Sequence, residues 1–153
     1  MIVRRAATRD MDGITGLLVR FHCEAGMVPL SVKKVSAALW SAMQNNRVWV
    51  AVHGDEIAGV MGVDECTLWY SETPVLETQF FYIAPEHRGS EIAKWLLGDA
   101  KEYADHVEMP LFVSITNPNR GHDRSPATRM AVRAGYVPMG YVTKINGEQA
   151  NVR

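Results

Sequence analysis

Apolar residues recur along the chain at two different spacings, and these spacings predict where helices and strands lie. Steps of three and four residues, which place side chains on one face of a helix, recur in three long segments. A serine–proline pair followed later by a glycine, a start and a stop signal, marks a fourth and shorter helix. The first predicted helix follows the caps Thr8 and Asp10 and ends before Gly26, and the second runs from Ser31 to about Asn45. The third opens at Gly89 or Ser90 with an apolar stripe reaching Ala104, and the fourth runs from Ser125-Pro126 to Gly135.

Runs of apolar, β-branched and aromatic residues lie between these helices and predict strands. The turn at residues 53–56 joins two of the strands into an antiparallel hairpin. Gly59 and Gly62 within that hairpin indicate close packing or a bulge. Residues 68–74 fit neither pattern. The predicted strands are Ile2–Ala6, Val48–Val52, Ile57–Val63, Thr78–Ile83 (expected to be buried on both faces), Leu111–Thr116 and Tyr136–Ile145.

The order of these elements predicts the architecture. A strand, two helices and three strands are followed by a helix, a strand, a second helix and a last strand or hairpin. Helices interleaved with a hairpin indicate a mixed sheet that is covered on both faces, in the α/β class. No repeat or long linker divides the sequence, so we expect residues 1–153 to form one domain.

Composition narrows the class of protein. The formal net charge is −1, 47% of residues are hydrophobic, and no apolar run approaches the roughly 20 residues that cross a bilayer. We therefore expect no membrane partner, a cytoplasmic location and no nucleic-acid partner, although arginines within residues 120–133 leave an anionic partner open. Cys23 and Cys66 provide neither a disulfide framework nor a zinc site, and we expect both to be small buried residues.

One segment carries a recognisable chemical arrangement, in which a strand stops at Pro85 and a polar loop leads into a helix. The first N–H groups of a helix have no intrahelical partner and lie at the positive end of its dipole. A loop containing Gly89 lets a phosphate oxygen approach those groups, and Arg88 adds a planar positive charge. This arrangement suits a diphosphate, but a plain strand–turn–helix connection with an exposed arginine has the same composition.

The pattern Ile-x-Pro-Glu-x-Arg-Gly-x-x-Ile-Ala-x-x-Leu-Leu at residues 83–97 resembles motif A of the GNAT N-acetyltransferases. In that family an Arg/Gln-x-x-Gly-x-Gly/Ala loop cradles the pyrophosphate of coenzyme A. The resemblance extends over nearly the whole chain in the family's order of elements. It implies a mixed, mostly antiparallel sheet, acetyl-CoA as cosubstrate, a small-molecule or peptide amine as acceptor and no metal. A homodimer is compatible with it.

The resemblance also assigns roles to individual positions. It places the pantetheine arm against the backbone of one strand and against a side chain that follows the neighbouring strand, and the diphosphate at the loop that opens the helix. The strand positions are Phe81, Tyr82 and Ile83, the loop positions are Arg88, Gly89, Ser90, Glu91, Ile92 and Ala93, and the side chain on the neighbouring strand is Asn117.

Two positions depart from the family's pattern. Glu91 stands where the family usually has glycine, and its carboxylate would repel a diphosphate unless it turns away or pairs with a cation. Ala131 stands where the family often has a tyrosine that protonates the departing thiolate. Ser125, Tyr136, Tyr141 or water would then supply the proton, or the chain would be a CoA-binding or regulatory module with little or no turnover.

Amine acetylation requires a neutral amine, donors for the developing oxyanion and a route for the amine's proton. A backbone N–H near Ile83 is the expected oxyanion donor. Glu77 is the first choice for a base or water-positioning group, and a solvated strand-end carboxylate is the alternative. The nearby acidic residues Asp64, Glu65 and Glu72 are candidates for attracting a cationic amine.

Overall fold

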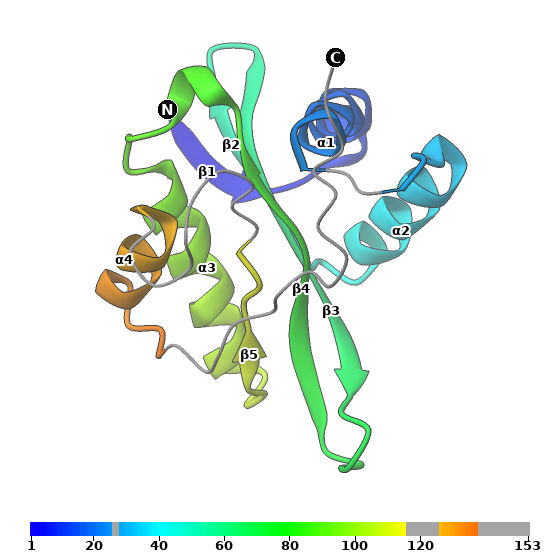
Figure 1. Ribbon diagram of the computed structural model, residues 1–153, viewed down its shortest axis with the longest axis vertical. Helices are drawn as coiled ribbons and strands as arrows, with labels where there is room; N and C mark the ends of the chain where they lie inside the picture. Colours follow the sequence, from blue (N-terminus) through cyan, green and yellow to red (C-terminus); the bar gives the residue numbers. More distant parts are fainter. Residues whose placement is uncertain (26–27, 116–125, 138–153) are drawn as a thin grey trace.

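A five-stranded sheet with helices on both faces forms the framework of the protein in the computed structural model, which describes residues 1–25, 28–115 and 126–137 (Figure 1). The strands lie in the order β1-β2-β3-β4-β5, antiparallel except for the parallel pair β4 and β5. The predicted mixed, mostly antiparallel sheet is therefore confirmed. The elements are β1 (Ile2–Arg5), α1 (Met11–Ala25), α2 (Val32–Gln44), β2 (Val48–His53), β3 (Glu56–Thr67), β4 (Pro74–Ile83), α3 (Ile92–His106), β5 (Leu111–Phe112) and α4 (Pro126–Arg133), with 3₁₀ turns at Thr8–Asp10 and Pro85–His87.

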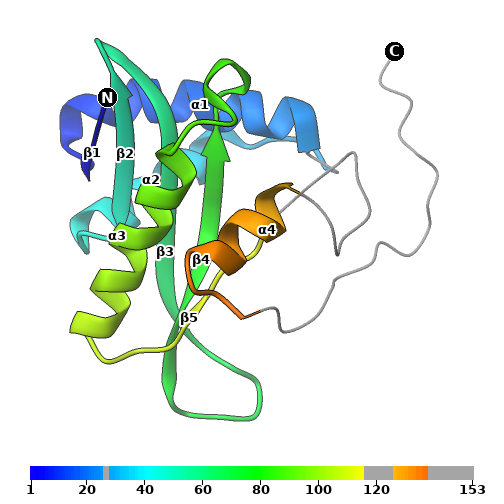
Figure 2. The same cartoon turned by 90° about the vertical axis from the view of Figure 1, so that its left-hand side faces the viewer.

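Two apolar layers hold the helices against the sheet. Helices α1 and α2 cover one face, and α3 and α4 cover the other (Figures 1 and 2). The stripe predicted for the third helix is confirmed, because Ile92, Leu96 and Leu97 are fully buried in the α3 layer. A Cβ on Gly59 would lie 3.1 Å from the Ile92 side chain, so this glycine allows α3 to approach the sheet closely.

Strands β3 and β4 are both longer than predicted and form a hairpin, not predicted from the sequence, that extends beyond the rest of the sheet (Figure 1). Its pairing shifts by one residue after Gly62, which leaves Gln79 of β4 without a counterpart in β3 and defines a β-bulge. We expected residues 78–83 to be buried on both faces, but Gln79 is exposed and Phe81 is half-buried. Gln79 is the bulged residue, and Phe81 lies beyond the last pair that β4 forms with β5.

Helix α3 begins at Ile92, two or three residues later than predicted. The 3₁₀ turn Pro85–His87 follows β4, and Gly89 in the loop after this turn adopts a φ of +85°. This left-handed conformation is incompatible with a right-handed helix, so regular α-helix starts only after it.

Several further expectations have outcomes in the described residues. Cys23 is exposed and Cys66 is half-buried, so the prediction of buried thiols was wrong; Cys66 lies on the projecting hairpin. Strand β5 covers only two of the residues predicted at 111–116. Gly135 follows α4 with a φ of +91°, as expected of a helix stop. The strand predicted at 136–145 lies almost entirely outside the described residues.

None of the helices in the described ranges is both long enough and apolar enough to span a membrane.

A partly buried ion pair ties β1 to the start of α1 and gives a pH-dependent prediction. Both guanidinium N–H₂ groups of Arg4 donate to Asp10, at 2.7 and 2.9 Å, and the Ala7 N–H donates to the same carboxylate at 2.7 Å. The bond from Arg4 lowers the pKa of Asp10 below its usual 3.8. A depressed carboxyl pKa stabilises the fold above the unfolded-state pKa, and this stabilisation is lost as pH falls through the folded-state value.

We therefore expect Asp10→Asn to lower the free energy of unfolding by about 2 kcal/mol at pH 7. The difference from wild type should shrink steadily below about pH 4, because protonation then removes the same charge from the wild-type protein. Urea unfolding at pH 7, 4 and 3 measures this. A difference that stays constant over that range would show that the ion pair does not stabilise the fold.

Candidate active site

The gap between β4 and β5 is the first component of the site. The two strands pair only at Leu76↔Leu111 and Glu77↔Phe112, and the last contact is the Thr78 hydroxyl donating to the Phe112 carbonyl at 3.2 Å. The bulge at Gln79 follows immediately. Because a bulge bends its strand and increases its twist, β4 turns away from the path of β5 at this point.

The upper part of β4 presents peptide groups to this gap. The Ala84 N–H donates to the Ala58 carbonyl at 3.0 Å, which fixes which residues of β4 exchange hydrogen bonds with β3. Bonded and non-bonded pairs alternate in an antiparallel ladder, so Phe81 and Ile83 direct their N–H and C=O groups away from β3. Their side chains pack toward α3, and Tyr82 packs toward α1.

The start of α3 is the second component. The first hydrogen bond of the helix runs from the Trp95 N–H to the Glu91 carbonyl at 3.0 Å, so the preceding amides have no intrahelical partner. The side chains of Ile92 and Ala93 are buried and anchor this first turn to the core. The helix therefore presents a fixed set of N–H donors at the positive end of its dipole.

The loop before α3 leaves space next to these donors. Nothing lies within 4 Å of the position that a Cβ on Gly89 would occupy. The Ser90 hydroxyl donates to the His87 carbonyl at 2.6 Å, and its oxygen lies 3.5 Å from the Ile92 nitrogen. These contacts hold the loop in one conformation, with its open side at Gly89.

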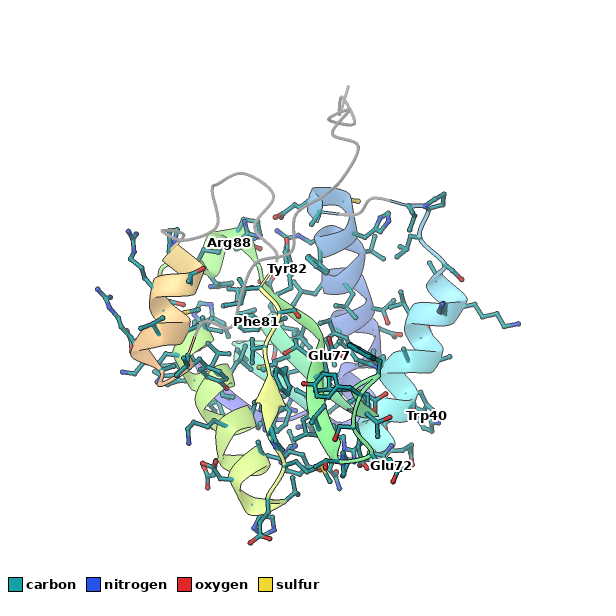
Figure 3. The ribbon with its side chains drawn as sticks, turned by 60° about the horizontal axis from the view of Figure 1, so that its bottom comes forward. Trp40, Glu72, Glu77, Phe81, Tyr82 and Arg88 are labelled. Carbon is teal, nitrogen blue, oxygen red and sulfur yellow. The ribbon has the colours of Figure 1, made fainter. Side chains whose placement is uncertain are left out.

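Arg88 is bound to α1 and to β4. Its Nη2 donates to the Glu24 carboxylate at 2.7 Å and its Nε donates to the Ile83 carbonyl at 3.0 Å. The guanidinium lies over the Tyr82 ring, 5.2 Å from its centroid. Figure 3 shows Arg88 beyond the end of the strand that carries Phe81 and Tyr82, in the loop that leads into α3. The guanidinium is therefore next to the gap but already paired with a carboxylate.

A second ion pair joins α1 to the same loop. Arg20 donates two hydrogen bonds to Glu86, at 2.9 and 2.8 Å, and these bonds lower the pKa of Glu86 to about 2.

Burial and a hydrogen bond to Glu24 raise the pKa of Tyr82 to about 12. Burial alone would raise the pKa of Glu24, but the bonds from Tyr82 and Arg88 lower it overall. Glu24 is thus an ionised acceptor at neutral pH.

Glu91 pairs within its own helix. Its carboxylate accepts from the Lys94 Nζ at 3.2 Å, and both side chains are largely exposed. The carboxylate that replaces the family's glycine is therefore next to a cation, one of the two arrangements that would reduce its repulsion of a diphosphate.

Glu77 lies where β4 and β5 part, among polar groups of the hairpin (Figure 3). It faces Asp64 directly across the β3–β4 ladder, and Asp64 accepts from the Gln79 amide at 2.9 Å and pairs with Arg47 at 3.4 Å. The Cys66 thiol donates to Glu77 at 3.6 Å, and burial followed by this bond raises the pKa of Cys66. No cation pairs with Glu77 among the residues that the structure describes.

Of the three candidate side chains for protonating the thiolate, Ser125, Tyr136 and Tyr141, the described residues include Tyr136. The Tyr136 hydroxyl donates to the Leu97 carbonyl at 2.8 Å, and burial raises the pKa of Tyr136 to about 12. Ala131 is buried against the core of the α3 layer and brings no polar group. Asn117, Ser125 and Tyr141 lie outside the described residues.

The structure adds three residues that sequence reasoning did not connect with the site, namely Glu24, Arg20 and Gln79. Glu24 and Arg88 are 64 positions apart, and no spacing within the sequence links them. The bulge at Gln79 had an indirect signal, because Gly62 was expected to mark close packing or a bulge.

Comparisons with known proteins agree with this geometry. A family model described as an acetyltransferase (GNAT) domain matches residues 44–142. Comparison with curated proteins gives no match. Among solved structures, a probable acetyltransferase aligns with a TM-score of 0.71 at 20% identity, covering 97% of this chain and 100% of the other.

Two further solved structures contain bound molecules. A predicted acetyltransferase from Clostridium acetobutylicum, solved with acetyl-CoA, aligns with a TM-score of 0.70 at 16% identity over 95% of each chain. An aminoglycoside acetyltransferase from an uncultured soil metagenomic sample, solved with sisomicin, aligns with a TM-score of 0.67 at 15% identity, covering 95% of this chain and 93% of the other. At these identities the likeness establishes the fold alone.

Proposed function

Because the chain belongs to the GNAT acetyltransferase family, we propose that it is an acetyl-CoA-dependent N-acetyltransferase that moves the acetyl group directly to an amine. The observation that carries this proposal is that β4, beyond its pairing with β5, leads directly into the loop and the first turn of α3. Outward peptide groups lie at the end of β4, and the helix amides, the open loop at Gly89 and Arg88 follow within the same segment.

The residues of this segment fit the chemical parts of acetyl-CoA. The amides of α3's first turn and the Arg88 guanidinium would hold the diphosphate, for which Gly89 leaves space. The outward peptide groups of Phe81 and Ile83 would bind the amide-rich pantetheine arm as a strand edge binds a partner. The Glu91–Lys94 pair reduces the repulsion expected from Glu91.

Acetyl-CoA supplies a thioester whose acetyl group passes to the acceptor amine, with free CoA thiol as the second product. Glu77 would accept or relay the proton that the amine loses, because it is ionisable, exposed and located where the strands part. The N–H of Ile83 or Phe81 would stabilise the developing oxyanion. Ser125, Tyr136, Tyr141 and water remain the proposed proton donors for the thiolate, although the Tyr136 hydroxyl is bonded to Leu97.

The acceptor is proposed to be a small-molecule amine. This rests on the structural likeness to aminoglycoside acetyltransferases, one of them solved with sisomicin, and on the acidic side chains around Glu77. An amine arrives as an ammonium ion, so Glu77 and Asp64 would attract it before it loses its proton.

Release of free thiol from acetyl-CoA tests the activity, with a panel of small amines, peptide N-termini, lysine side chains and aminoglycosides. With an accepted amine, we expect Glu77→Gln to lower kcat about tenfold, less than the 10²–10⁴-fold typical of a group that takes the proton directly, because water can relay it. Glu56→Gln, a matched change at an exposed carboxylate at the other end of β3, should leave kcat within about twofold. Equal effects of the two changes would remove Glu77 from the mechanism.

One observation favours a second candidate function, a CoA-binding module without turnover. Ala131 brings no hydroxyl to the place where the family often has its acid, and its side chain is buried in the core. Tight CoA binding together with no thiol release across the whole panel would favour this alternative over the enzyme.

A further inference from the structure

Two ion pairs of opposite polarity fasten the last turns of α1 to the loop that precedes α3. Arg20 of α1 binds Glu86, and Glu24, one helical turn later, binds Arg88. The distances are 2.8 and 2.7 Å, and the paired residues are exposed or partly exposed. Only the second pair involves a residue that the proposed function assigns to the diphosphate.

We propose that Glu24 is a positioning residue that occupies Arg88 in the free protein and must release it when CoA binds, so that Glu24 sets the affinity for the diphosphate. This inference rests on the proposed function, because it takes Arg88 as the residue that receives the diphosphate. Glu24 itself touches neither the diphosphate nor the reacting atoms; it acts through Arg88.

The contacts of Arg88 explain why the two acceptors compete. The Nε and Nη2 groups, which form one edge of the guanidinium, donate to the Ile83 carbonyl and to Glu24, and the Tyr82 ring covers one face. A diphosphate that binds Arg88 through two parallel hydrogen bonds along this edge therefore needs a position that Glu24 occupies.

The structure around Glu24 allows the exchange without loss of the fold. Glu24 has a second partner, the Tyr82 hydroxyl, which keeps its carboxylate in place when Arg88 turns away. The Arg20–Glu86 pair continues to hold α1 against the loop. Release of Arg88 therefore breaks one of the contacts that hold α1 against β4 and the loop, and leaves the others in place.

The test measures CoA affinity by isothermal titration calorimetry on the full chain. Replacing Glu24→Gln keeps the size of the side chain and its bond to Tyr82 but removes the charge that holds Arg88. We expect CoA to bind about fivefold more tightly, the effect of freeing a partner from an exposed ion pair. Glu86→Gln removes the ion pair between Arg20 and Glu86, and we expect the affinity of this variant for CoA to stay within about twofold of wild type.

A double variant separates competition from a general loosening of α1. If Glu24 acts only through Arg88, then Glu24→Gln added to Arg88→Ala should give no gain over Arg88→Ala alone. An equal gain in Glu24→Gln and Glu86→Gln would show that loosening α1 is responsible and would overturn the proposal. An unchanged or weaker affinity in Glu24→Gln would overturn it as well. A wild-type protein that binds no CoA at all would instead overturn the proposed function.

Discussion

The Arg88→Glu variant is expected to bind acetyl-CoA about 100-fold more weakly than the wild-type protein. The substitution removes the cation next to the α3 amides and places a carboxylate there, so attraction of the diphosphate becomes repulsion at short range. Each of the two changes is worth about 1–2 kcal/mol at a partly exposed site, which together give that loss of affinity. Titration calorimetry, and the rise in melting temperature at saturating acetyl-CoA, both measure it.

Lys101→Glu is the matched control for this charge reversal. Lys101 lies on α3, nine residues after its first residue Ile92, and pairs with Asp105. The change in net charge is the same, but the site is far from the first turn, so affinity should stay within about twofold. If the two variants bind acetyl-CoA equally well, Arg88 does not receive the diphosphate.

The Gly62→Ala variant is expected to lose about 3 kcal/mol of unfolding free energy, a large cost for the addition of one methyl group. A Cβ at this position would lie 2.2–2.8 Å from three atoms of the Phe80 ring, which is shorter than any van der Waals contact. The ring is buried in the α1 layer and sits next to the bulge, so it cannot move without disturbing both. Urea unfolding gives the free energy directly.

The same substitution at Gly98 should have the opposite sign. Gly98 lies inside α3, and nothing is within 4 Å of the Cβ that alanine would add. Alanine is favoured over glycine in a helix by about 1 kcal/mol, so Gly98→Ala should stabilise the protein. Equal effects at the two positions would mean that backbone freedom, and not the Phe80 ring, determines the cost at Gly62.

Local patterns in the sequence were enough to predict the order of the elements and the covered sheet. The spacing of Ile92, Leu96 and Leu97 placed α3 correctly against the core, because one face of a helix repeats within a few residues. The start of the same helix was misplaced, since the left-handed conformation of Gly89 depends on the loop as a whole. The burial of β4 was overestimated because sequence spacing shows neither the bulge at Gln79 nor where pairing with β5 stops.

The candidate site was predictable only in part, for a similar reason. The helix amides and the glycine lie within one short segment, so their association could be inferred from their order. The partner of Arg88 could not, because Glu24 reaches it from α1, 64 positions earlier in the sequence. Ion pairs of this kind depend on how α1 packs against β4, which no local pattern specifies.

The early separation of β4 from β5 has a consequence for how the protein responds to its ligand. A sheet whose neighbouring strands stop pairing after two residues is, in effect, missing part of a strand. A bound molecule that carries its own amides would complete the ladder, much as a donated peptide completes an unfinished fold. Ligand binding and the rigidity of β4 and β5 where they separate would then be coupled. We expect this part of the sheet to become more ordered when a ligand hydrogen-bonds to the unpaired edge of β4.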